Sequence, residues 1–131
     1  YGNDSNSAKA HLLGNSLTEP LAFTPLQRHE LRNALRLAMF RGLMNLEQCE
    51  ATFNQIEMDT QLGILQECAI LWGDAYSQAE MLSAKYTKAI GTRGFDILHV
   101  ACAVTLGVKI FLSFDTRQKS LAIKAGLTVN E

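Results

Sequence analysis

The segment "GFDILHVACAVTLGVKIFLSFDT", residues 94–116, decides the fold. From Phe95 to Leu106 it is almost wholly apolar and long enough for a buried helix. After Gly107, "VKIFLSF" is rich in Val, Ile and Phe, as β-strands are. Asp96 is the exception, because burying an unpaired charge is costly. Its carboxylate therefore needs a compensating neighbour, a metal ion or access to water.

Helices and short strands alternate along the rest of the chain. Apolar spacing and capping residues predict helices near residues 5–13, 26–41, 46–56, 71–86, 95–106 and 116–125. Short strands are predicted at residues 21–24, 62–65, 108–114 and 127–129, and a loop, "TKAIGTRG", at residues 87–94. The pattern predicts an α/β fold, with helices on both faces of a central, mostly parallel sheet.

Length and composition are those of a globular domain. The chain has 131 residues, 47% hydrophobic and 19% charged, so we expect one domain over residues 1–131. No apolar run is long enough for a membrane span, and the start has no signal-peptide pattern, so we expect a cytoplasmic protein without membrane contact. Cys49, Cys68 and Cys102 form no CxxC pair, so we expect no disulfide framework in this chain.

Three acidic residues are expected at one edge of the sheet. A helix from Asp96 to Leu106 is about 16 Å long, and the strand at residues 109–113 spans a similar distance at ~3.3 Å per residue. Asp96 and Asp115 therefore return to the same edge. Glu30, shortly after the strand at residues 21–24, joins them if the strands are parallel. Clustered carboxylates repel unless a cation neutralises them, and oxygen ligands favour Mg²⁺ or Mn²⁺.

Each acid also has a purely structural interpretation. Glu30 can be an early-turn acid favoured by the helix dipole, and Asp115 can be the N-cap of the following helix. Asp96 is the hardest to explain by capping, because its surroundings are apolar. A phosphoacceptor signalling domain also gathers acids at a sheet edge. It needs a lysine beyond the end of a late strand, whereas Lys109 begins its strand.

Three successive segments resemble the motifs of one known family. "TPLQRHEL", "GTRGFDILHVACAVTLGV" and "FLSFDTRQKSLAIKAGLTV" are similar, in order and spacing, to the PIN domain of the VapC-like bacterial kind. The resemblance implies a three-layer α/β/α sandwich. It also implies a magnesium- or manganese-dependent endoribonuclease that hydrolyses RNA phosphodiesters, often as the toxin of a toxin–antitoxin pair. A cognate antitoxin protein and a homodimer formed through the helices are the implied partners.

The resemblance also assigns site residues. Glu30 matches the family's second acid, Asp96 the third and Asp115 the fourth, and these are the implied catalytic and metal-binding residues. Thr116 matches a hydroxyl position that supports the metal or the substrate phosphate. Arg93 and Arg117 are expected phosphate contacts, by position and chemistry.

The family's first acid has no match in this chain. It belongs to an Asp-Thr or Asp-Ser pair at the end of an N-terminal strand, and no such strand precedes Tyr1. Asp4 is not a substitute, because it lies beside the expected cap of the first helix. We expect the start of the domain, with this strand, to have been removed or left out. The alternative is a non-catalytic PIN-like module that binds RNA or protein.

Other polar and aromatic residues receive structural interpretations. His99, one turn after Asp96, is expected to be a hydrogen-bonded structural residue rather than a metal ligand. Trp72 and Tyr76 are predicted to belong to the core rather than to a base-stacking platform. Lys85 and Lys88, near Arg93, are expected to form a solvated basic loop, with steering of RNA as the alternative.

Overall fold

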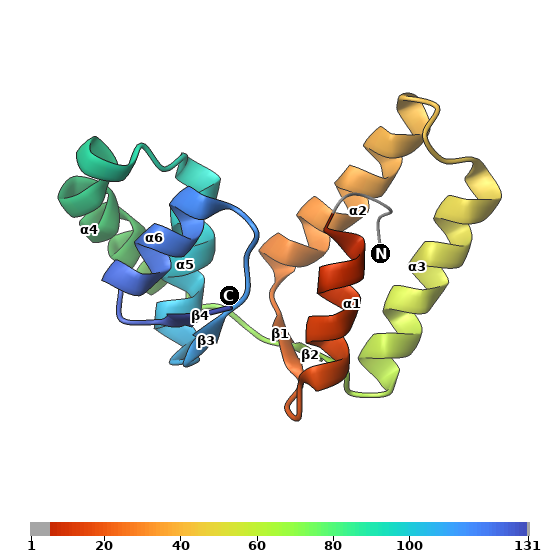
Figure 1. Ribbon diagram of the computed structural model, residues 1–131, viewed down its shortest axis with the longest axis horizontal. Helices are drawn as coiled ribbons and strands as arrows, with labels where there is room; N and C mark the ends of the chain where they lie inside the picture. Colours follow the sequence, from red (N-terminus) through yellow and green to blue (C-terminus); the bar gives the residue numbers. More distant parts are fainter. Residues whose placement is uncertain (1–5, 131) are drawn as a thin grey trace. The chain divides into compact units, whose positions relative to one another are not determined.

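Helices and short strands alternate along residues 6–130, the part of the chain that the computed structural model describes (Figure 1). In chain order they are α1 (Ser7–Ser16), β1 (Leu21–Phe23), α2 (Pro25–Phe40), α3 (Leu46–Gln61), β2 (Leu65–Glu67), α4 (Trp72–Ile90), α5 (Gly94–Leu106), β3 (Ile110–Phe111), α6 (Thr116–Lys124) and β4 (Thr128–Val129). The chain divides into a first unit, Tyr1–Ala69, and a second unit, Ile70–Glu131. Each unit has its own hydrophobic core.

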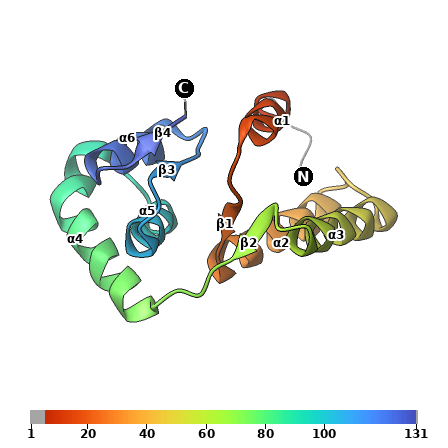
Figure 2. The same ribbon diagram turned by 90° about the horizontal axis from the view of Figure 1, so that it is seen from below.

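A parallel strand pair and a helical hairpin build the first unit. Strand β1 pairs with β2 in the register Leu21 to Leu65. Helices α2 and α3 pack against each other, and β2 follows α3 (Figure 2). Apolar side chains from both helices and both strands form the core. They are Phe23, Leu35, Cys49, Ile56 and Leu65.

Helix α2 begins at a complete capping box. The Thr24 side chain accepts the backbone N–H of Gln27 at 3.3 Å, and Gln27 Oε1 accepts the backbone N–H of Thr24 at 2.8 Å. Pro25 occupies the first helical position, where its missing N–H costs nothing. These residues fix the start of the helix, and Glu30 therefore lies in its second turn.

Arginine side chains fix α2 against its neighbours. Arg28 and Arg32 both donate to Glu57 Oε1 on α3, at 2.7 and 3.0 Å, and Arg28 also pairs with Glu67 at the end of β2. The guanidinium of Arg32 lies 4.7 Å from the centre of the Phe53 ring. Because these groups are partly exposed, we expect each pair to contribute modestly to stability.

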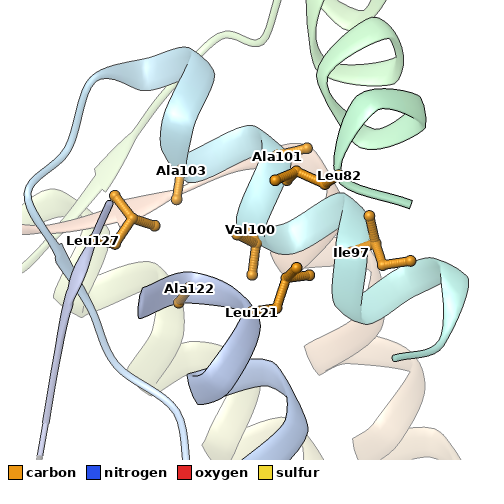
Figure 3. Packing of buried hydrophobic residues seen from close by; sticks show 8 residues of the cluster. All are labelled: Leu82, Ile97, Val100, Ala101, Ala103, Leu121, Ala122 and Leu127. Atoms are coloured by element: carbon orange, nitrogen blue, oxygen red, sulfur yellow. The ribbon is translucent and has the colours of Figure 1, made fainter. Parts of the chain in front are cut away.

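The second unit has a β-α-β arrangement covered by two helices. Strands β3 and β4 are parallel neighbours, and α6 connects them. Helices α4 and α5 pack closely together, and both contact α6. In Figure 3, Val100 of α5 and Leu121 of α6 point toward each other within the core cluster. The buried residues of the cluster are Leu82, Ile97, Val100, Ala101, Ala103, Leu121, Ala122 and Leu127.

Helix α5 is the buried element that its sequence predicts. Its residues 97, 98 and 100–103 are all buried. The helix ends at Gly107, whose φ of 70° is readily adopted by glycine and which donates its N–H to Ala103 and Val104. Burial raises the pKa of the Cys102 thiol, because desolvation disfavours the thiolate. Cys102 is a buried free cysteine, and it packs as a small apolar side chain.

The predicted α/β class agrees with this structure, but the sheet differs from the expected one. Within residues 6–130 the strands form two separate parallel pairs, β1–β2 and β3–β4, so a clear three-layer sandwich around one central sheet is not seen. A single domain over residues 1–131 stays a prediction. Among the described residues, no helix combines the length and the apolar character that a membrane span needs.

Several predicted boundaries were wrong. Helix α4 continues through residues 87–90 of the predicted loop and ends only at Gly91, where φ is 73°. The strand predicted at residues 62–65 lies at Leu65–Glu67, because Leu62 caps α3 and Gly63 turns the chain with a φ of 73°. Strand β3 is shorter than predicted, since its partner β4 offers two residues for pairing.

The predicted burial of Trp72 and Tyr76 was also wrong. Tyr76 is 60% exposed and Trp72 36%, with their ring centres 6.2 Å apart. Helix α4 buries Ala75 and Leu82 instead. The apolar periodicity was correct, but it did not indicate which side of the stripe faces the core.

Candidate metal centre

Asp96 lies in the first turn of α5 and is half-buried. The helix has Arg93 as its N-cap residue, without a side-chain capping bond, so the helix dipole favours an acid at this end. Within residues 6–130, the Asp96 carboxylate has no hydrogen-bond or ion-pair partner. A half-buried carboxylate without a partner in the described part of the chain is well suited to bind a cation.

Asp115 is the N-cap of α6, as its structural interpretation predicts. Its Oδ1 accepts the backbone N–H groups of Arg117 and Gln118, both at 2.8 Å. No donor among the described residues reaches Oδ2. One oxygen of this exposed side chain therefore caps the helix, and the other is available to a ligand.

A polar network surrounds the loop that carries Asp115, and sequence reasoning missed most of it. The Ser113 hydroxyl accepts the backbone N–H of Asp115 at 3.1 Å and donates to Gln118 Oε1 at 2.7 Å. The backbone N–H of Ser113 donates to Oδ1 of Asn130 at 2.8 Å. The available signal was weak: a serine two residues before the acid, and an asparagine directly after a short apolar strand.

The N-terminal ends of α5 and α6 lie close together in the second unit. Arg117 Nη1 donates to the carbonyl oxygen of Gly91 at 3.4 Å, which ties the first turn of α6 to the loop before α5. Figure 1 draws both helices with their first turns at the same end of the unit. Asp96 and Asp115 therefore belong to the same end, where the chain leaves the carboxyl end of β3.

Glu30 belongs to the first unit. It is half-buried in the second turn of α2, and it has an interaction partner. The expected trio of acids is thus divided, with Glu30 in one unit and Asp96 and Asp115 in the other. Within residues 6–130, no three His, Cys, Asp or Glu side chains are gathered closely enough to hold a metal ion. Asp4 lies outside the described residues.

The donor chemistry of the second unit fits a hard divalent cation. It offers the Asp96 carboxylate and the free oxygen of Asp115, and carboxylate oxygens are preferred ligands of Mg²⁺ and Mn²⁺. Mg²⁺ is commonly held by one or two carboxylates, with water and substrate phosphate completing the shell. Two acids at one end of the unit are therefore within the range of protein ligands that Mg²⁺ takes.

The predicted phosphate contacts are exposed around the same two helix ends. Arg93 precedes α5, and Thr116 and Arg117 begin α6. Lys85 and Lys88 lie in the last turns of α4 rather than in a loop, and Lys85 Nζ is 5.1 Å from the centre of the Tyr86 ring. His99 is half-buried and has an interaction partner.

A scan against protein-family models and a search of curated proteins each gave no match to this chain.

Proposed function

We propose that the protein is a metal-dependent endoribonuclease that hydrolyses RNA phosphodiesters. The observation that carries the proposal is that Asp96 and Asp115, at the starts of α5 and α6 at one end of the second unit, each offer carboxylate oxygen that no donor of the described residues takes. Among the described residues, no Lys, Arg or His side chain pairs with the Asp96 carboxylate or with Oδ2 of Asp115. Carboxylate oxygens that no protein donor takes are suitable ligands for a hard divalent cation.

Each residue has a role in this proposal. Asp96, Asp115 and Glu30 hold the metal ion through carboxylate oxygens. Bound Mg²⁺ or Mn²⁺ supplies charge neutralisation at the phosphodiester and lowers the pKa of water. Arg93 and Arg117 contact the RNA phosphates on either side, and the Thr116 hydroxyl supports one phosphate oxygen.

The charge distribution supports RNA as the substrate. In the second unit lysine and arginine outnumber aspartate and glutamate, whereas in the first unit the acids are in excess. The basic excess of the second unit, with Arg93 before α5 and Arg117 in the first turn of α6, favours attraction of a polyanion to this unit, which the net charge of −1 alone would not. RNA would therefore lie mainly along the second unit.

The proposal includes a PIN-like three-layer sandwich. In such a fold the strands of both pairs belong to one central parallel sheet. Parallel pairing within both pairs supports this arrangement. By the same resemblance we propose a cytoplasmic toxin with a cognate antitoxin protein, and a homodimer.

An RNA cleavage assay tests the proposed activity. The protein should cut single-stranded RNA when Mn²⁺ is present and lose this activity when the metal is chelated. Asp96→Asn should abolish cleavage, because the amide removes the charge that holds the cation. Asp74→Asn is a matched control, since Asp74 is also a first-turn acid, on α4, and is exposed. Cleavage that survives Asp96→Asn would refute the proposal.

The same assay separates the alternative, a non-catalytic PIN-like binding module. The absence of a three-ligand cluster within residues 6–130 is the observation that favours this alternative. RNA that is retained by the protein in a mobility-shift experiment but stays intact with Mn²⁺ would support the binding module over the nuclease.

A further inference from the structure

Asn130 is a buried polar residue with no role in the proposed function so far. It follows β4 directly and is 8% exposed. Its Oδ1 accepts the backbone N–H of Ser113, which lies in the loop between β3 and α6. Buried polar side chains are usually retained with specific partners, and one partner of Asn130 is the segment that carries Asp115.

The hydrogen bonds continue from Asn130 to Asp115 without a gap. Ser113 is held by Asn130 through its backbone, and its hydroxyl accepts the N–H of Asp115 while donating to Gln118. Asp115 Oδ1 in turn accepts the N–H of Gln118. The loop is therefore held near the end of β4 by Asn130 and at the start of α6 by the Asp115 cap.

Because the strands are short, the segment between β3 and Asp115 has no strand pairing within residues 6–130 to hold it. The β3–β4 pair has two residues in each strand, so its backbone bonds end before the loop begins. Beyond Phe111, the contact between Asn130 and Ser113 links the end of β4 to the loop. Without it, the loop around Asp115 would be held only by the helix cap and by the Ser113 hydroxyl, which bonds to Asp115 and Gln118.

We propose that Asn130 is a positioning residue that acts through Ser113 to aim Oδ2 of Asp115 at the bound metal ion. This inference rests on the proposed function, because it assumes that Asp115 is a ligand. Residues that orient metal ligands typically change metal affinity by roughly 10–100-fold when they are replaced. Asn130 belongs to that class, although it does not touch the ion.

Binding of Mn²⁺ alone, measured by titration calorimetry, tests the role of Asn130. Asn130→Leu keeps the side-chain volume and removes the acceptor, so the affinity should fall by about tenfold. Asn130→Asp keeps an oxygen in the same place and should retain most of the affinity. The amide-proton shift of Ser113 should move in the leucine variant and stay near its original position in the aspartate variant.

Val129→Ala is the matched control for a purely structural effect. Val129 is the last residue of β4, directly before Asn130, and it packs against the core. This variant therefore loses stability without losing the hydrogen bond between Asn130 and Ser113. Its Mn²⁺ affinity should be unchanged. Should Asn130→Leu fail to fold, Asn130→Ala removes the same acceptor without added bulk and replaces it in the comparison.

The outcomes distinguish the two levels of the proposal. A protein that binds Mn²⁺ equally well with and without the Asn130 acceptor would overturn the positioning role and leave the nuclease standing. A starting protein that binds no Mn²⁺ would overturn both. A tenfold loss in Asn130→Leu, with recovery in Asn130→Asp, would support the positioning role.

Discussion

At the scale of the residue, Asp115 performs two tasks with two oxygens. Oδ1 caps α6 through two backbone N–H groups, and Oδ2 is left for a ligand. Capping needs an acceptor but no charge, because asparagine caps helices about as well as aspartate. Metal binding needs the charge. The two tasks can therefore be separated by substitution.

Asp115→Asn should keep the stability of the protein and lose its Mn²⁺-dependent cleavage. Asp115→Ala should lose both, with a decrease of about 1 kcal/mol in the free energy of unfolding, the usual value of an N-cap. Urea denaturation gives the stability of each variant, and the RNA assay gives its activity. An asparagine variant that still cleaves RNA would show that Asp115 is only a cap.

The sequence predicted the cap but only part of its surroundings. An aspartate three residues before Gln118 is a capping pattern, and the acceptor role of Asp115 follows from it. The side chain of Gln118 does not close the box, however, because the Ser113 hydroxyl takes the N–H of Asp115 and donates to Gln118. Asn130 was beyond prediction, since its partner is 17 residues away.

At the scale of the element, local signals located the helices and strands but not all of their ends. The capping pattern at Asn45 correctly predicted the start of α3, whereas the capping box at Thr24, a residue predicted to end a strand, starts α2 at Pro25. The end of α4 was missed because its apolar stripe weakens after Tyr86, whereas the helix continues to the glycine that can turn left-handed. Short strands depend on their partners, which local sequence does not specify.

Gly107→Ala tests the importance of the glycine that ends α5. Gly107 has a φ of 70°, and a Cβ added there meets no atom within 4 Å, so the cost lies in the backbone alone. The free energy of unfolding should fall by about 1–2 kcal/mol, the cost of the left-handed conformation for a residue with a Cβ. Thermal unfolding followed by circular dichroism measures the change.

Gly73→Ala is the control for this substitution. Gly73 lies inside α4 without a positive φ, and a Cβ added there also meets no atom within 4 Å. Because Gly73 is the second residue of α4 and alanine favours a helix, this variant should be at least as stable as the original protein, with a gain below about 1 kcal/mol, the value for a helix interior. Equal effects of the two substitutions would contradict a conformational role of Gly107.

At the scale of the whole molecule, the sequence predicted one sheet, whereas residues 6–130 form two strand pairs, one in each unit. Each pair forms by contacts between neighbouring elements, which the alternation of helices and strands already indicates. Joining the pairs into one sheet depends on contacts between distant segments, and hydrophobic periodicity carries no information about these. The position of Glu30 relative to Asp96 and Asp115 is therefore the least predictable part of the candidate site.

Paramagnetic Mn²⁺ provides a test of whether Glu30 completes the site. The ion broadens the amide signals of residues close to it, so a site that includes all three acids should broaden signals around Asp96 and Asp115 and also around Glu30 in α2. In Glu30→Gln the broadening in α2 should weaken, while the second unit keeps its two ligands.

Glu50→Gln is the control for this substitution. Glu50 is an exposed acid of α3, and its replacement should leave the pattern of broadened signals unchanged. Diamagnetic Mg²⁺ should shift the same signals without broadening them. Broadening confined to the second unit in the original protein would exclude Glu30 as a ligand and limit the metal centre to Asp96 and Asp115.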